Sequence, residues 1–151
     1  MHAKNKTFNN IKIHTQYSIC EGAIKISNLA KFCKENKIKS IGLSDSFNLC
    51  GALEFSEEIS KAGTQPIIGS QINFEFNNTI GKLPIFAKTE KGFNNLTKLS
   101  SKSYLDLKKD SEFPHCKISD LLENHEDLII TSGGLDSLFA KVVHKNNTKI
   151  F

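Results

Sequence analysis

Short apolar segments alternate along this chain with segments of helical periodicity, and no other feature of the sequence constrains the fold as strongly. Alternating or continuous apolar residues predict strands over residues 11–14, 40–44, 66–76, 83–88 and 128–131. Apolar residues at helical spacing predict helices over residues 24–36, 49–62, 92–99, 118–122 and 135–144. Residues 77–81 favour a turn, and hence a hairpin or a sheet edge. This order predicts an α/β fold with a mostly parallel sheet, open or curling toward a barrel.

Length and composition indicate a globular protein of one domain. The 151 residues, 38% of them hydrophobic, are enough to bury a core, and no linker or low-complexity stretch is present. A formal charge of +4 permits contact with nucleic acid without requiring it. Apolar runs are far shorter than the roughly 20 residues of a membrane span, and the first residues do not resemble a secretion signal. We therefore expect a cytoplasmic protein without membrane contact.

The cysteines are too widely spaced to form a zinc site of the common kind. They form no C-x-x-C motif and no cluster with histidine. Each lies beside apolar residues, and a free thiol behaves as a small apolar group in a core. We therefore expect reduced, buried thiols at Cys20, Cys33, Cys50 and Cys116.

Candidate sites in an α/β fold lie in the loops that follow the strands, because side chains from several strands converge there. One such loop, SGGLDS at residues 132–137, resembles the pyrophosphate-binding loop of ATP pyrophosphatases. Only 14 residues follow Ser137, too few to build an adenine pocket. The alternative is a strand-to-helix turn in which glycines supply the bend and Asp136 lies in the first turn of the helix.

A much longer similarity covers nearly the whole chain. The runs IKIHTQYSICEGAIKISNLAKFCKENKIKSIGLSDSFNLCGALEFSEEISKAGTQPIIGSQINF, LPIFAKTEKGFNNLTKLSSKSYL and DLIITSGGLDSLFAKVV resemble the N-terminal PHP (polymerase and histidinol phosphatase) domain of the bacterial replicative DNA polymerase III alpha subunit. The resemblance implies a PHP-type (βα) barrel-like fold, here an incomplete barrel. It divides the chain into an N-terminal extension, residues 1–8, and a PHP-like domain, residues 9–151, that stops before the last barrel units and the polymerase domains.

The resemblance also implies a degenerate metal site. Active PHP domains hold several metal ions through histidine and carboxylate ligands for phosphoester hydrolysis. The corresponding positions here are Lys12, His14, Glu21, Asp45, Ser46, Gln71, Lys82 and Gly134. Only His14 and Glu21 remain as plausible ligands, because the lysines are cations without a free lone pair and Asp45 is better suited to orient local hydrogen bonds. We expect the phosphoesterase site to be lost, with no catalytic residue and no cofactor in this chain.

The charge pattern suggests how such a site could persist without metal. Lys12 and Lys82 stand where the family has metal ligands, and either could pair with Glu21 or Asp45 and so replace the missing cations. His14 is expected to be a hydrogen-bonded histidine at the end of a strand.

Three functions follow from these observations. The first is a structural domain of a DNA-directed DNA polymerase; its partners are the rest of the alpha subunit and the replisome subunits, and DNA and Mg²⁺ are bound by the parent protein. The second is a residual phosphoesterase that binds Mn²⁺ or Zn²⁺ through His14 and Glu21. The third is an ATP-binding module that uses the SGGLDS loop.

Overall fold

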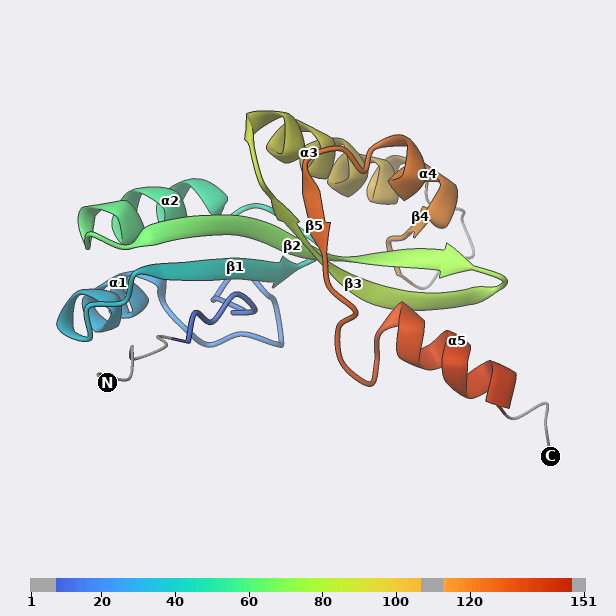
Figure 1. The fold of residues 1–151 in the computed structure, drawn as a ribbon, viewed down its shortest axis with the longest axis horizontal. Helices are drawn as coiled ribbons and strands as arrows, with labels where there is room; N and C mark the ends of the chain where they lie inside the picture. Colours follow the sequence, from blue (N-terminus) through green and yellow to red (C-terminus); the bar gives the residue numbers. More distant parts are fainter. Residues whose placement is uncertain (1–7, 107–112, 148–151) are drawn as a thin grey trace, which may run out of the picture.

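A computed structural model describes residues 8–106 and 113–147 of the chain. Five strands and five helices follow one another in an order close to the one expected (Figure 1). They are α1 (Ile26–Glu35), β1 (Ser40–Ser46), α2 (Ala52–Lys61), β2 (Gln65–Phe76), β3 (Thr79–Ala87), α3 (Glu90–Leu105), β4 (Cys116–Lys117), α4 (Ile118–Glu123), β5 (Leu128–Ile130) and α5 (Leu138–Asn147). Apart from Phe8, the predicted N-terminal extension lies outside the described residues.

The strands form one open, mixed sheet in the order β1-β2-β3-β5, with β4 paired to the far end of β2. β1 and β4 run parallel to β2, whereas β3 is antiparallel to both β2 and β5. The prediction of a mostly parallel sheet was therefore wrong. The reason is the two-residue turn between β2 and β3, where Asn77 and Asn78 both adopt positive φ and fold the chain into a hairpin.

The segment at residues 11–14 is not a regular strand, which corrects a second expectation. It still runs beside β1, because the carbonyl oxygens of Asn10 and Ile13 accept hydrogen bonds from the backbone of Gly42 and Ser44. The backbone of Ile11 passes so close that a Cβ added at Gly42 would lie 2.3 Å from the Ile11 oxygen. The glycine thus permits the approach that brings His14 to the end of β1.

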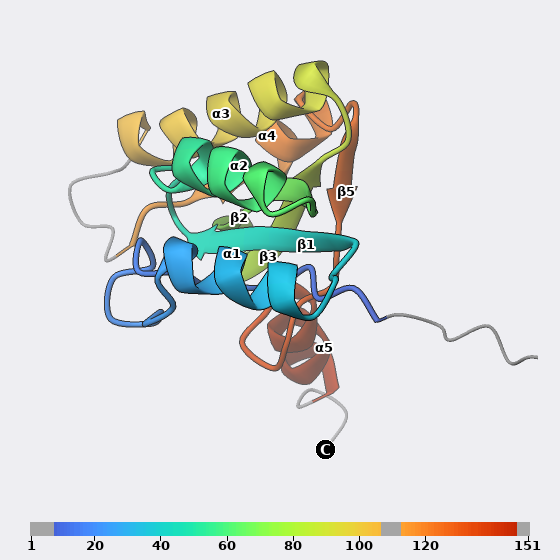
Figure 2. The same cartoon turned by 90° about the vertical axis from the view of Figure 1, so that its left-hand side faces the viewer.

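Two apolar clusters hold the helices against the sheet. The first joins α1 and α2 to β1, and Figure 2 shows these two helices at the β1 end of the molecule. The second joins α3, α4 and the start of α5 to β2 and β3. In Figure 1, α2, α3 and α4 lie above the sheet and α5 lies below it beside β3.

The C-terminal helix begins later than expected. The sequence pattern predicted a start at Leu135, but α5 starts at Leu138 and the Ser137 hydroxyl accepts a hydrogen bond from the Ala140 backbone at 3.2 Å. Asp136 therefore precedes the helix and does not lie in its first turn. Within residues 8–106 and 113–147, no helix is long and apolar enough to cross a membrane.

Candidate functional site

The pairing register gives the two faces of the β2–β3 hairpin opposite chemistry. Side chains alternate along a strand, and paired residues lie on the same face. Ile72 opposite Leu83 belongs to the apolar face that packs against α3. The other face carries two further pairs, Gln71 with Pro84 and Asn73 with Lys82. Ser46 pairs with Gln71 and extends this face onto β1. Its polar members Ser46, Gln71, Asn73 and Lys82 are all buried or partly buried.

Lys82 and Glu21 form the ion pair at the centre of this polar face. The Lys82 Nζ lies 2.6 Å from Glu21 Oε1, and their side chains are 23% and 36% exposed. The Ser46 hydroxyl donates a hydrogen bond to the other Glu21 oxygen. Two of the candidate positions from the sequence, Ser46 and Lys82, therefore hold a third, Glu21. The pairing of Lys82 with Glu21, raised as a hypothesis from the sequence, is present.

The ammonium of Lys82 makes two further contacts. It lies 3.8 Å from Asp136 Oδ2 and 5.4 Å from the centre of the Phe47 ring. A cation over an aromatic face is attracted by the ring quadrupole. Lys82 thus connects three loops: the one that carries Glu21, the one after β1 and the one before α5.

The electrostatic surroundings fix the charge states of Glu21 and His14. Burial opposes ionisation of Glu21, but the hydrogen bonds from Lys82 and Ser46 prevail and lower its pKa. Burial lowers the pKa of His14, and the charges of Lys12 and Lys82 lower it further, against the effect of Glu21. These shifts favour the carboxylate form of Glu21 and the neutral form of the His14 imidazole.

Asp45 organises the loop that carries His14 and Glu21. This fully buried carboxylate accepts hydrogen bonds from the Thr15 backbone at 2.6 Å, the Thr15 hydroxyl at 2.7 Å and the Ser18 hydroxyl at 2.6 Å. Ser18 Oγ lies 3.3 Å from His14 Nδ1. The expectations that Asp45 orients local hydrogen bonds and that His14 is hydrogen-bonded are confirmed.

A cleft of about 530 Å³ opens in front of the ion pair. Glu21, Phe47, Asn73, Lys82 and Asp136 line it, and Lys141 on α5 closes one side by donating a hydrogen bond to the Ile80 carbonyl at 2.9 Å. Because Glu21 and Asp136 balance Lys82 and Lys141, the lining has no excess of either charge.

The SGGLDS loop lies at the rim of the same cleft. Its Asp136 faces Lys82, and Ser137 forms a backbone bridge to Lys82 and caps α5. Gly133 adopts φ of 76°, and Gly134 is exposed, with its carbonyl accepting a hydrogen bond from Ser137 at 3.1 Å. The Ser137 hydroxyl and the Asp136 carboxylate thus contact other groups of the protein. This arrangement agrees with the alternative interpretation of the loop as a strand-to-helix turn.

The donor set does not fit a metal cluster. Within residues 8–106 and 113–147, no three His, Cys, Asp or Glu side chains converge as a metal site would require. Both Glu21 oxygens already accept hydrogen bonds, one of them from an ammonium group that would repel a metal ion. Lys12 is exposed and its side chain forms no ion pair among the described residues, so its expected pairing with Glu21 or Asp45 is not present.

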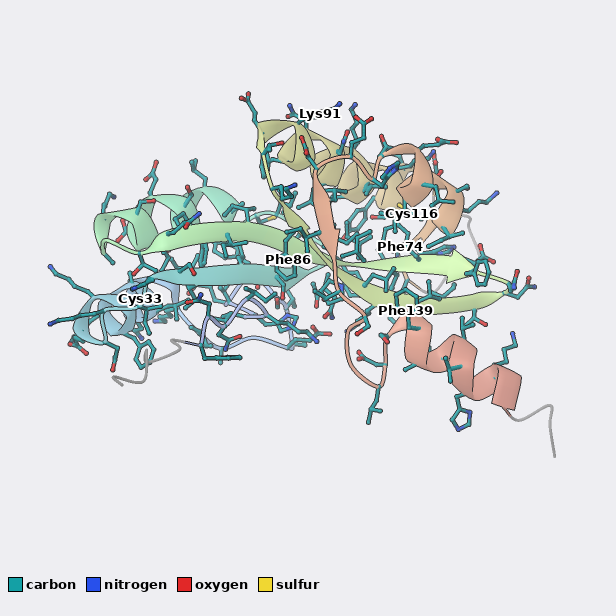
Figure 3. All side chains as sticks on the ribbon, viewed as in Figure 1. Cys33, Phe74, Phe86, Lys91, Cys116 and Phe139 are labelled. Atoms are coloured by element: carbon teal, nitrogen blue, oxygen red, sulfur yellow. The ribbon has the colours of Figure 1, made fainter. Side chains whose placement is uncertain are left out.

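Sequence reasoning placed Phe47, Thr15 and Ser18 in loops that follow predicted strands but gave them no role in this site. Phe47 has a φ of 64°, an unusual backbone conformation for a bulky residue, and no local pattern predicts its place below Lys82. The cysteines take no part. Cys20 and Cys50 are exposed, contrary to expectation, whereas Cys33 and Cys116 are buried in separate parts of the molecule (Figure 3).

Comparison with known proteins identifies the family of this chain. Residues 10–150 match the PHP domain family. The DNA polymerase III subunit alpha of Caulobacter vibrioides is 38% identical over 91% of this chain, and that of Helicobacter pylori is 32% identical over 97%. The chain spans 13% of the length of each of these relatives. A solved amidohydrolase structure from Chromobacterium violaceum matches 62% of this chain and 34% of its own, at 11% identity and a TM-score of 0.48.

An open, mixed α/β sheet with a polar cleft on one face of its β2–β3 hairpin defines the structural class. The chain belongs to the PHP domain family. It is similar to the PHP domain of DNA polymerase III alpha subunits over nearly its whole length.

Proposed function

We propose that this chain serves DNA replication as a structural PHP domain of a DNA polymerase III alpha subunit and hydrolyses no phosphoester itself. Its partners are then the remainder of that subunit and other replisome proteins in the cytoplasm. DNA, deoxynucleotides and Mg²⁺ are bound elsewhere in the parent polymerase. The similarity to curated alpha subunits over more than nine tenths of the chain supports the placement in replication.

The Lys82–Glu21 ion pair is the observation that carries the structural part of this proposal. A phosphoesterase of the multi-metal type needs cations that polarise the phosphate and lower the pKa of a bound water. Here the ammonium group of Lys82 balances the charge of the Glu21 carboxylate. This ammonium group cannot bind a water molecule as a Lewis acid, and its covalent attachment keeps it in the site. The polar face therefore keeps its charge balance while it lacks the groups for hydrolysis.

A hydrolysis assay tests this proposal against the alternative of a residual phosphoesterase. The purified chain is incubated with a chromogenic phosphodiester and with Mn²⁺ or Zn²⁺ added in turn. We expect no turnover above that of the Glu21→Gln variant. This variant removes the carboxylate that pairs with Lys82 in a structural domain and that would bind the metal in a residual phosphoesterase. Turnover that requires added metal and disappears in Glu21→Gln and in His14→Ala would establish the residual enzyme instead.

A further inference from the structure

A short segment of the chain lies along the far end of β2 and forms part of the wall of the polar cleft. We call this segment, residues 113–117, the strap. Phe113 lines the cleft together with Asn73, and the Asn73 amide donates a hydrogen bond to the Pro114 carbonyl at 3.2 Å. The strap contains neither partner of the ion pair described above, so its behaviour is independent of the proposed function.

The backbone pairing of the strap is short. Cys116 pairs with Phe74 and Lys117 pairs with Glu75, which makes a ladder of two residues (Figure 3). A segment with so few backbone hydrogen bonds opens at a low free-energy cost. The buried Cys116 thiol donates a hydrogen bond to the Leu99 carbonyl at 3.2 Å, and burial raises its pKa to about 12. Access to this thiol therefore reports whether the strap is open.

His115 connects the strap to β2 through its imidazole ring. Its Nδ1 lies 3.0 Å from the Phe113 carbonyl oxygen, which can only accept a hydrogen bond, so Nδ1 carries a proton. Its Nε2 lies 3.8 Å from Glu75 Oε2. In the neutral ring Nε2 is then an acceptor beside a carboxylate, whereas in the protonated ring it is a positively charged N–H donor. Protonation therefore turns a contact between two acceptors into an ion pair.

The charges around His115 also favour a positive ring. Among the residues that the structure describes, the charged groups that line a cavity of about 390 Å³ together with His115 are Glu75 of β2, Lys102 of α3, Asp106 at the end of α3, Lys117 of β4 and Asp120 of α4. Lys102 Nζ and Asp120 Oδ1 form an ion pair at 2.6 Å. Three carboxylates thus meet two ammonium groups, and protonation of His115 makes the two charges equal.

We propose that protonation of His115 holds the strap against β2 and that deprotonation releases it, so that the pH sets how open this wall of the cleft is. The protonated ring attracts the Glu75 carboxylate, whereas the neutral ring presents a lone pair to it. Histidine changes its charge between about pH 5 and pH 8. The strap is therefore closed at the acidic end of this range and opens as the pH rises. Opening displaces Phe113 and frees the Asn73 amide.

Thiol labelling of the full 151-residue chain tests this proposal. A pyridyl disulfide reacts with the chain, and peptide mass spectrometry gives the labelling rate of each cysteine. The rate for the same cysteine in the urea-unfolded chain at the same pH, divided by the native rate, gives its protection. We expect the protection of Cys116 to fall about threefold to fivefold between about pH 5.5 and pH 8. Cys33, buried in the first apolar cluster, should show no such fall.

Two variants separate the titration of His115 from other causes. Glu75→Gln removes the negative partner, and His115→Asn keeps a donor near the position of Nδ1 but cannot gain a charge. In both variants the protection of Cys116 should be the same at either pH and equal to that of the unchanged chain at the higher pH. Glu57→Gln is the matched control, because this carboxylate on α2 is 59% exposed, and it should keep the pH dependence.

Three results would overturn the proposal. The first is a pH dependence of Cys116 that persists in both Glu75→Gln and His115→Asn. The second is an equal fall in the protection of Cys33, which would indicate unfolding of the whole chain. The third is a protection of Cys116 that does not change with pH in the unchanged chain.

Discussion

The two faces of the β2–β3 hairpin differ in what they contribute to the protein. One face carries Ile72, Phe74, Leu83 and Ile85, all at most 1% exposed and packed against Leu96 and Leu99 of α3. The other face carries Gln71, Asn73 and Lys82, and the last two line the cleft. Strand alternation places both sets on the same two strands.

The difference shows that stability and site chemistry are separable in this fold. Burial of large apolar side chains on the first face supplies most of the stabilisation, since each contributes roughly 1.5–3 kcal/mol. The second face contributes little net free energy, because partly exposed ion pairs are weak. Residues of the polar face can therefore vary in their chemistry while the sheet remains the same.

The largest effect is expected on the apolar face. Phe74→Ala removes a fully buried ring from the second apolar cluster and should lower the free energy of unfolding by about 3–5 kcal/mol. Urea unfolding followed by circular dichroism measures it. A loss below about 1 kcal/mol would show that this face does not dominate stability, and the comparison of the two faces would fail.

Asp45 should have the next largest effect, although it serves the polar loops. Asp45→Ala leaves the Thr15 backbone and hydroxyl and the Ser18 hydroxyl without their acceptor in a buried position, at a cost of about 3 kcal/mol. The matched change Asp136→Ala, at a carboxylate whose side chain is 60% exposed, should cost less than about 1 kcal/mol. Similar losses in both variants would contradict the assigned role of Asp45.

Replacement of Lys82 separates charge compensation from packing. Lys82→Met keeps the aliphatic stem but removes the ammonium, and it should lower stability by about 1 kcal/mol in thermal or urea unfolding. Lys12→Met is the control and should change stability by less than about 0.5 kcal/mol, because the exposed Lys12 side chain forms no ion pair among the described residues. If Lys12→Met lowered the stability more than Lys82→Met, then Lys12 and not Lys82 would be the lysine that compensates the buried charge.

The smallest effect is the pH dependence of the same ion pair. The pKa of Glu21 is below its ordinary value of 4.5 in the folded chain, so the contribution of this group to stability is complete above that value. It is lost as the pH falls through the lowered pKa. Lys82→Met should raise the pKa of Glu21, which NMR titration of its carboxyl carbon measures. An unchanged pKa in this variant would show that Lys82 does not stabilise the carboxylate.

Most elements could be predicted from sequence because local patterns determine them. The apolar periodicity of α1, α2 and β2 placed these elements within a few residues of their observed bounds. The turn at residues 77–81 was predicted with a hairpin as one of two alternatives, and the hairpin is present. The sequence did not decide between the alternatives, because the turn depends on two asparagines with positive φ, a conformation that the sequence permits but does not impose. The two-residue strand β4 was missed because its pairing with Phe74 and Glu75 is a tertiary contact.

The site was predicted only in part, because some of its contacts depend on the tertiary fold. The sequence placed a lysine where a carboxylate needs a cation, and the Lys82–Glu21 pair follows from this requirement. It could not distinguish Lys82 from Lys12, because only the fold shows which of the two reaches Glu21. The contacts of Lys82 with Phe47 and Asp136 join segments far apart in the chain, and no spacing in the sequence indicates them.

The metal content of the purified chain tests the central claim most directly. The chain is produced in medium supplemented with zinc and manganese, and inductively coupled plasma mass spectrometry counts the ions per chain. If the Lys82 ammonium replaces the metal ions of the cleft, the chain should contain far less than one ion, and Glu21→Gln should not change this value. Two or more tightly bound ions per chain, lost in Glu21→Gln, would contradict the account.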